Sequence, residues 1–160
     1  MKYFLSIVAL LLDVSFSNGQ KPENDLSSDI AKMIQSHNFE FVAESANPMR
    51  GRSIFLSHGY TFNVRPDSLI SFLPYYGRAY QATMDPASAG IKFTSTDFEY
   101  WEKPRKKRAW DIQFRPKDVQ NSPQLHLSIG ASGQASLRVT LVDRESISFQ
   151  GYIRKKPTDL

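Results

Sequence analysis

The chain has 160 residues, a length that corresponds to one domain, and its hydrophobic fraction of 41% excludes wholesale disorder. Its net charge of +4 is compatible with weak attraction to anionic surfaces but does not require it. The sequence contains no cysteine, which excludes disulfides and any lipoprotein anchor attached through a cysteine. We therefore expect a fold that is held together by its hydrophobic core alone.

The first residues predict a secretory signal peptide over residues 1–19. Lys2 precedes an apolar run from Tyr3 to Leu12, which is too short to span a bilayer. Small residues follow at Ser17 and Gly19, where cleavage is expected. The sequence thus predicts export across the inner membrane, to the periplasm or the cell exterior, without a lipid anchor. Residues 20–25 are polar and predict a flexible junction before a single β-rich domain over 26–155 and a tail over 156–160.

One amphipathic helix is predicted at the start of this domain, over residues 26–37. Its apolar residues share one face at a spacing of 3.6 residues: Leu26, Ile30, Met33 and Ile34. Ser27 or Ser28 is expected to cap its first amides. A helix of about three turns is marginal alone, so we expect it to pack on a sheet.

From residue 39 onward the apolar period is two, which is typical of strands. Apolar and polar residues alternate in the segments 39–44, 60–65, 91–101, 110–115, 125–129, 135–141 and 147–153. Short turn-forming stretches separate most of them. The pattern predicts a mainly β fold: an antiparallel meander of about eight strands that forms either a curled sheet or a small barrel.

Two local features of this meander are predicted from the sequence. Residues 53–57 and 60–65 flank His58-Gly59 and predict a hairpin. Between residues 91 and 101 the apolar positions change parity near Thr96 or Asp97, which predicts a bulge there.

The stretch Ser68–Phe93 contains an unusual cluster of side chains around Gly77: Tyr75, Tyr76, Arg78 and Tyr80. Tyrosine offers a flat area with a polar tip and arginine a planar fork for anionic oxygens, so the cluster predicts a ligand-binding patch. A structural alternative is that the tyrosines pack on the sheet while Arg78 pairs with backbone carbonyls or a carboxylate, for which the candidates are Asp85, Asp97 and Glu99. Gly77 is expected to allow a positive φ in a turn.

A basic run lies between two aromatic-rich strands, at an expected hairpin tip: Lys103, Arg105, Lys106, Lys107 and Arg108. It is interpreted either as a solvated loop or as a contact to anionic lipid or polysaccharide. Nucleic-acid binding is not expected, because the charge is concentrated at a tip and not spread along a face with stacking aromatics.

Catalytic and metal sites are not predicted. The three histidines lack the spacing of metal ligands, and we expect neither a metal nor another cofactor. Ser132 lies in a glycine-containing turn without the spacing of a nucleophile elbow. Asp97 and Glu99 are two residues apart, as the carboxylates of a glycosidase can be, and they remain the residues on which a hydrolase hypothesis depends.

Several stretches together resemble a known family: FEFVAESANPMRGRSI (Phe39–Ile54), LPYYGRAY (Leu73–Tyr80), GIKF (Gly90–Phe93), and ASLRV and SISFQGYI within Ala135–Ile153. The sequence resembles a family of Bacteroidetes proteins catalogued as domain of unknown function 4251, whose members look like secreted or lipid-anchored proteins. The resemblance implies a fold and a compartment, and it implies no activity. Unlike many relatives, this chain lacks the lipoprotein cysteine.

The sequence therefore predicts a secreted, envelope-associated, non-enzymatic module that binds a ligand or partner near Tyr75–Tyr80. Its expected partner is an envelope protein, a lipid or an anionic polysaccharide. One alternative is a carrier that holds a lipid or another apolar molecule inside a curled sheet. A hydrolase that uses Asp97 and Glu99 is the other.

Overall fold

The computed structural model describes residues 23–78, 80 and 90–156. The predicted signal peptide, the first residues of the junction, Asp85 and residues 157–160 lie outside this part of the chain.

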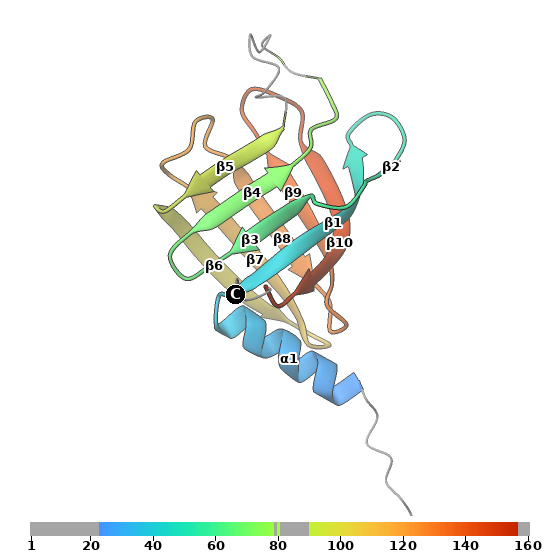
Figure 1. Ribbon diagram of the computed structural model, residues 1–160, viewed down its shortest axis with the longest axis vertical. Coiled ribbons are helices and arrows are strands. Elements are labelled where there is room, and N and C mark those ends of the chain that lie inside the picture. Colours follow the sequence, from blue (N-terminus) through green and yellow to red (C-terminus); the bar gives the residue numbers. More distant parts are fainter. Residues whose placement is uncertain (1–22, 79, 81–89, 157–160) are drawn as a thin grey trace, which may run out of the picture.

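The described residues form one helix and ten strands (Figure 1). In chain order the elements are α1 (Glu23–Gln35), β1 (Phe39–Pro48), β2 (Ile54–Phe55), β3 (Thr61–Val64), β4 (Leu69–Leu73), β5 (Ile91–Ser95), β6 (Phe98–Arg105), β7 (Ala109–Pro116), β8 (Gln124–Ile129), β9 (Gln134–Thr140) and β10 (Ile147–Arg154). All strand pairs are antiparallel, in the order β5-β4-β3-β1-β10-β9-β8-β7-β6, with β2 paired to β1. The sheet curls into a nearly closed barrel, so the predicted fold class is confirmed.

The two ends of the sheet are joined by the segment that contains the predicted bulge. β5 pairs with β4 and β6 pairs with β7, and Thr96 and Asp97 alone separate β5 from β6. The irregularity predicted there is therefore a corner at which one extended segment passes from one sheet edge to the other. The Asp118 carboxylate holds this corner through the Ser95 hydroxyl and the backbone amides of Thr96 and Asp97. These hydrogen bonds, that of Ser95 foremost, lower the pKa of Asp118 to about 2.

Apolar side chains fill the interior of the barrel. Phe62 on β3 and Phe114 on β7 are both buried, and their ring centroids lie 5.2 Å apart in an edge-to-face contact. Because β3 and β7 are not neighbours in the sheet, this contact crosses the interior. Such packing counts against the predicted alternative of a carrier with a ligand inside the barrel.

Helix α1 lies across one end of the barrel (Figure 1). Ile30 and Ile34 are buried, and the Ile30 side chain packs directly over Gly133, which immediately precedes β9. The apolar face predicted from the 3.6-residue spacing thus covers the core. The helix begins at Glu23, three residues before the predicted start, so the expected cap at Ser27 or Ser28 is wrong; both serines lie within the helix.

The predicted hairpin between residues 53–57 and 60–65 is also wrong. The turn at His58-Gly59 forms, and Gly59 has a φ of 107°. However, β2 and β3 both pair with β1, at Ser45–Ala46 and at Phe39–Val42 respectively. The ten-residue β1 offers enough edge for both segments, and this long-range pairing replaces the local one.

Candidate functional site

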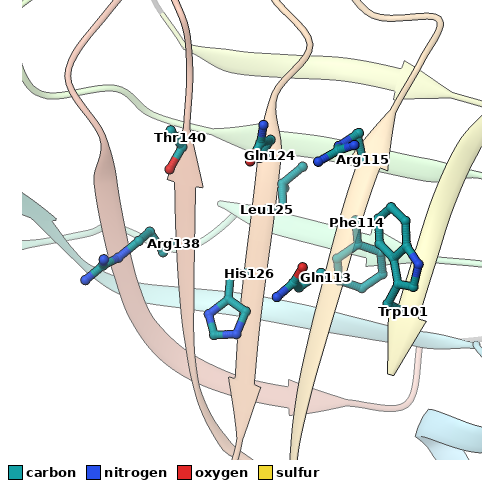
Figure 2. A pocket seen from close by; sticks show the side chains of 9 residues that line it. All are labelled: Trp101, Gln113, Phe114, Arg115, Gln124, Leu125, His126, Arg138 and Thr140. Carbon is teal, nitrogen blue, oxygen red and sulfur yellow. The ribbon is translucent and has the colours of Figure 1, made fainter. Parts of the chain in front are cut away.

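The outer face of strands β6 to β9 carries a row of four side chains at directly opposed positions. Trp101 pairs in register with Gln113, Gln113 with His126, and His126 with Arg138. Side chains alternate between the two faces of a strand, so these four point away from the core whereas Phe114 and Leu125 point into it. Figure 2 shows the four side chains following one another across the four strands. We refer to Trp101, Gln113, His126 and Arg138 as the central row.

A flanking row lies on each side of the central row. The upper flanking row contains Glu99, Arg115, Gln124 and Thr140, and the lower one contains Lys103, Asp111, Ser128 and Ser136. The central row and the last three residues of the upper row line a shallow depression of about 150 Å³ (Figure 2).

Each flanking row contains a carboxylate that is engaged by neighbouring side chains: Glu99 beside Trp101, and Asp111 beside His126. Glu99 accepts from Lys117 at 3.0 Å and lies 3.7 Å from Arg115. The Asp111 carboxylate accepts a 2.7 Å hydrogen bond from the Ser128 hydroxyl, and Arg105 lies 3.4 Å away. These contacts hold the flanking side chains in place on both sides of the central row.

The middle of the face is different. Within the described part of the chain, the side chains of Gln113, Gln124 and Arg138 make no hydrogen bond or ion pair, and all three are exposed. Trp101 is 47% exposed, and the Arg115 guanidinium lies 5.6 Å from its ring centroid. His126 Nε2 is 4.0 Å from Asp111. The depression therefore presents unpaired donors and acceptors beside a partly exposed indole.

The predicted patch at residues 75–80 lies after β4, and part of it holds the fold together. The Tyr75 hydroxyl is 3.0 Å from the carbonyl oxygens of both Arg78 and Glu145, and its proton can bond either. The backbone pairs as well: the Glu145 amide donates to Arg78 and the Tyr80 amide donates to Asp143. This segment is thus joined to the turn that precedes β10.

Tyr75 also stacks on a buried cation. The guanidinium of Arg144 lies 5.0 Å from the Tyr75 ring centroid and is paired with Asp143 at 2.8 Å. Burial, which outweighs the opposing effect of Arg144, raises the pKa of Tyr75. The structural interpretation therefore holds for Tyr75, while Arg78 and Tyr80 remain exposed and a binding role for them stays a prediction.

The reason for a glycine at position 77 differs from the expected one. Gly77 is not among the residues with a positive φ. A Cβ atom there would lie 2.7 Å from the Tyr75 hydroxyl oxygen, so the glycine allows the tyrosine ring to fold back over it. Of the predicted partners of Arg78, Glu99 binds Arg115 and Lys117, Asp97 makes no ion pair with it, and Asp85 lies outside the described residues.

The basic run begins on β6 and ends at the predicted hairpin tip: Lys103 and Arg105 lie within β6, and residues 106–108 connect it to β7. Lys107 and Arg108 have positive φ values of 62° and 53°, which form the turn. Arg108 donates a 2.7 Å hydrogen bond to the Ser27 hydroxyl on α1, and Arg105 contacts Asp111. Two of the five cations thus have structural contacts, while Lys103, Lys106 and Lys107 are exposed.

The residues of the hydrolase hypothesis lie at the corner of the sheet and at the start of β6. Asp97 is exposed in the turn, and Glu99 on β6 is held by Arg115 on β7 and by Lys117, which directly follows β7. Among the described residues, no group of three or more histidine, aspartate or glutamate side chains is placed to hold a metal ion. Nor does the described part of the chain contain a helix long and apolar enough to cross a membrane.

The sequence matches the family model described as Domain of unknown function (DUF4251) over residues 21–153. The chain belongs to this family. A crystal structure of a DUF4251 family protein from Bacteroides eggerthii DSM 20697 shares the fold of this DUF4251 domain, with a TM-score of 0.61 and 11% sequence identity. The alignment covers 82% of this chain and 88% of that chain. None of the curated proteins matches the sequence.

The central row of this DUF4251 domain was not predicted from the sequence. Its members are 12 or 13 positions apart, and each alone is an ordinary outward residue of an alternating strand. The alternation could have assigned all four to the outer face. Their alignment in one row depends on the register of three strand pairs, which no local motif specifies.

Proposed function

We propose that this DUF4251 domain is an exported, non-enzymatic binding module whose ligand is a polysaccharide chain that lies across the outer face of β6 to β9. The observation that supports this proposal is the unpaired state of Gln113, Gln124 and Arg138 beside the exposed ring of Trp101. Export is supported by the signal peptide predicted over residues 1–19.

The chemistry of the depression suits a sugar. Sugar rings have hydroxyl groups at their rim and apolar C–H groups on their faces. The two glutamine amides both donate and accept hydrogen bonds, and the Arg138 fork donates several. Trp101 offers a flat apolar surface against which a ring face can pack. These groups supply both kinds of contact on one surface.

The dimensions of the row favour a chain over a single sugar. Neighbouring strands are about 4.8 Å apart, so the central row extends roughly 14 Å from β6 to β9. That length exceeds one sugar ring. The depression is also shallow, with a volume of about 150 Å³, as an open site for an extended ligand requires.

Other ligands and reactions suit this face less well. A protein partner suits the face less well, because the core of a protein interface is mainly apolar, whereas Trp101 is the large apolar side chain of an otherwise polar central row. A single strand of nucleic acid requires a basic groove with several stacking rings, whereas Glu99 offsets the charge of Arg115 here. Hydrolysis of the ligand is disfavoured for a different reason. The carboxylates that border the row, Glu99 and Asp111, are both engaged with cations or a hydroxyl.

Arg78 and Tyr80 form a second candidate surface, at the other end of the barrel from α1. Tyr80 is 67% exposed, and backbone hydrogen bonds to the turn at 143–145 fix the positions of both residues. Binding of a ligand there would cost little conformational entropy of the protein, because these residues are already ordered. The two surfaces are distinguished by substitution.

The experiment is affinity electrophoresis of the mature protein in gels that contain one polysaccharide each, neutral or acidic, followed by calorimetry with the one that retards migration. We expect Arg138→Ala to weaken binding about tenfold or more, because the arginine contributes hydrogen bonds to the ligand. Arg78→Ala is the matched control and should bind as the wild type does.

The opposite result, in which Arg78→Ala and Tyr80→Ala weaken binding and Arg138→Ala does not, would move the site to the second surface. Tyr76, the remaining member of the predicted patch, is partly buried and packs against the core. Release of shortened sugars from the bound polysaccharide would contradict the non-enzymatic part of the proposal. Sequencing of the amino terminus of protein purified from the cell envelope tests export. A mature chain that begins after Ser17 or Gly19 is expected.

A further inference from the structure

Basic and apolar features meet at the end of the barrel that α1 covers. The hairpin tip between β6 and β7 lies beside the helix, because Arg108 reaches the Ser27 hydroxyl. On the other side of the helix, a groove of about 660 Å³ separates α1 from the end of β10 and is bordered by Arg154 and Lys155. Figure 1 shows the helix lying across this end of the barrel.

The helix presents an apolar side chain between these two basic groups. Leu26 is 48% exposed, although Ile30 and Ile34 on the same face are buried. Leu26 and the half-buried Met33 line the groove together with Ile153 from β10. The end of the barrel thus combines an exposed apolar strip with cations on both sides.

Much of the positive charge at this end is uncompensated. Within the described residues, Lys106, Lys107 and Lys155 make no ion pair. Several acidic side chains at this end are paired with cations: Asp29 with Lys32 at 3.3 Å, Glu40 with Arg154, and Asp111 with Arg105 at 3.4 Å. Glu102 on β6 accepts a hydrogen bond from the Tyr100 hydroxyl. Two further acidic positions, 23 and 25, lie in the first turn of α1.

We propose that this end of the domain docks on an anionic lipid bilayer, with the hairpin tip and Lys155 against the headgroups and Leu26 inserted between them. Basic residues attract anionic membranes, and a partly exposed apolar residue on an amphipathic helix adds contact with the acyl boundary. The polysaccharide-binding face of the proposed function lies along the outer side of β6 to β9, whereas the docking surface is the turn between β6 and β7 together with α1, so both ligands can be held at once.

The test is co-sedimentation of the mature protein with vesicles of phosphatidylcholine alone or of phosphatidylcholine mixed with phosphatidylglycerol. We expect binding to the mixed vesicles alone, and weaker binding at high salt because ions screen exposed charges. Lys106→Gln with Lys107→Gln should lower the partition coefficient about 30-fold, since each lysine near an anionic surface contributes about fivefold. Leu26→Ser should lower it further.

The matched control removes the same charge elsewhere. Arg52 and Arg78 are exposed and lie away from α1. Arg52→Gln with Arg78→Gln should therefore change the partition coefficient much less than the lysine pair does. All substituted positions are exposed, and circular dichroism verifies that each variant folds.

Three results would overturn the proposal: equal binding to neutral vesicles, no binding to either kind, or an equal loss in both double variants, which would indicate a response to net charge alone. If soluble dextran sulfate causes the protein to sediment and anionic vesicles do not, the basic end binds a polyanion and not a membrane. Because the vesicles contain no sugar, these results are independent of the polysaccharide experiment.

Discussion

Two surfaces of this DUF4251 domain are rich in aromatic and hydrogen-bonding side chains, and they differ in what those side chains contact. In the Tyr75–Tyr80 segment, the Tyr75 hydroxyl reaches two backbone carbonyls and its ring covers the Arg144 guanidinium. In the central row, Gln113 and Arg138 have no side-chain partner in the described part of the chain. The first surface uses much of its chemistry to hold the fold, and the second leaves its chemistry available to a ligand.

The difference shows that a dense cluster in the sequence is not by itself a binding site. Tyr75 and its neighbours are close in the chain because they form a local turn that must be anchored, and the anchor is a strand connection 70 residues later. The members of the central row are far apart in the chain, and the sheet aligns them. Substitutions should therefore affect stability at the first surface and binding at the second.

The largest expected effect is the loss of stability on Tyr75→Ala. Removal of the half-buried ring leaves the space over Gly77 unfilled. It also removes the hydroxyl that donates to the Arg78 and Glu145 carbonyls. We expect the free energy of unfolding to fall by roughly 2–4 kcal/mol. Urea denaturation at neutral pH measures the change.

Tyr80→Ala is the control for that loss. Tyr80 is 67% exposed and contributes its backbone amide, which alanine retains, to the contact with Asp143. Its substitution should change the free energy of unfolding by no more than about 0.5 kcal/mol. Equal losses in both variants would contradict the assignment of the anchoring role to Tyr75.

An intermediate effect is expected at the central row, on binding and not on stability. Trp101→Ala removes the flat surface for the sugar ring and should weaken polysaccharide binding about tenfold, while the midpoint of urea denaturation changes little. Trp101→Phe keeps an aromatic face and should restore part of the affinity. Calorimetry with the polysaccharide that retards the wild type measures both variants. If Trp101→Phe binds as weakly as Trp101→Ala, the ring does not stack on the ligand.

Alternation of apolar and polar residues was enough to predict the fold class, because each strand has one buried face and one exposed face. It also located the corner at Thr96 and Asp97, where the buried parity changes. The pairing of β2 and β3 with β1 could not be predicted in this way. A two-residue turn favours a hairpin locally, and the competing long edge of β1 is formed only in the assembled sheet.

The candidate sites were predictable to different degrees for the same reason. The hairpin tip at residues 106–108 follows from local sequence, although Lys103 and Arg105, which were also expected at the tip, lie within β6. Its contact with Ser27 joins residues 81 positions apart and has no sequence signal. The central row likewise depends on registers of three strand pairs, each of which a shift by one residue would destroy.

The smallest expected effect separates the two surfaces by pH. Burial raises the pKa of Tyr75 in the folded protein, whereas a tyrosine in the unfolded chain titrates near 10. The folded state therefore holds this proton more tightly, and the free energy of unfolding should fall as the pH rises above about 10, until the raised pKa is passed. Burial also raises the pKa of Tyr100, so the wild type combines both contributions.

Tyr75→Phe removes the contribution of Tyr75, and its stability should decline less steeply in alkaline urea denaturation than that of the wild type. Trp101→Ala, which removes no titrating group, should follow the wild-type slope. Parallel curves for Tyr75→Phe and the wild type would show that the Tyr75 hydroxyl is not coupled to folding.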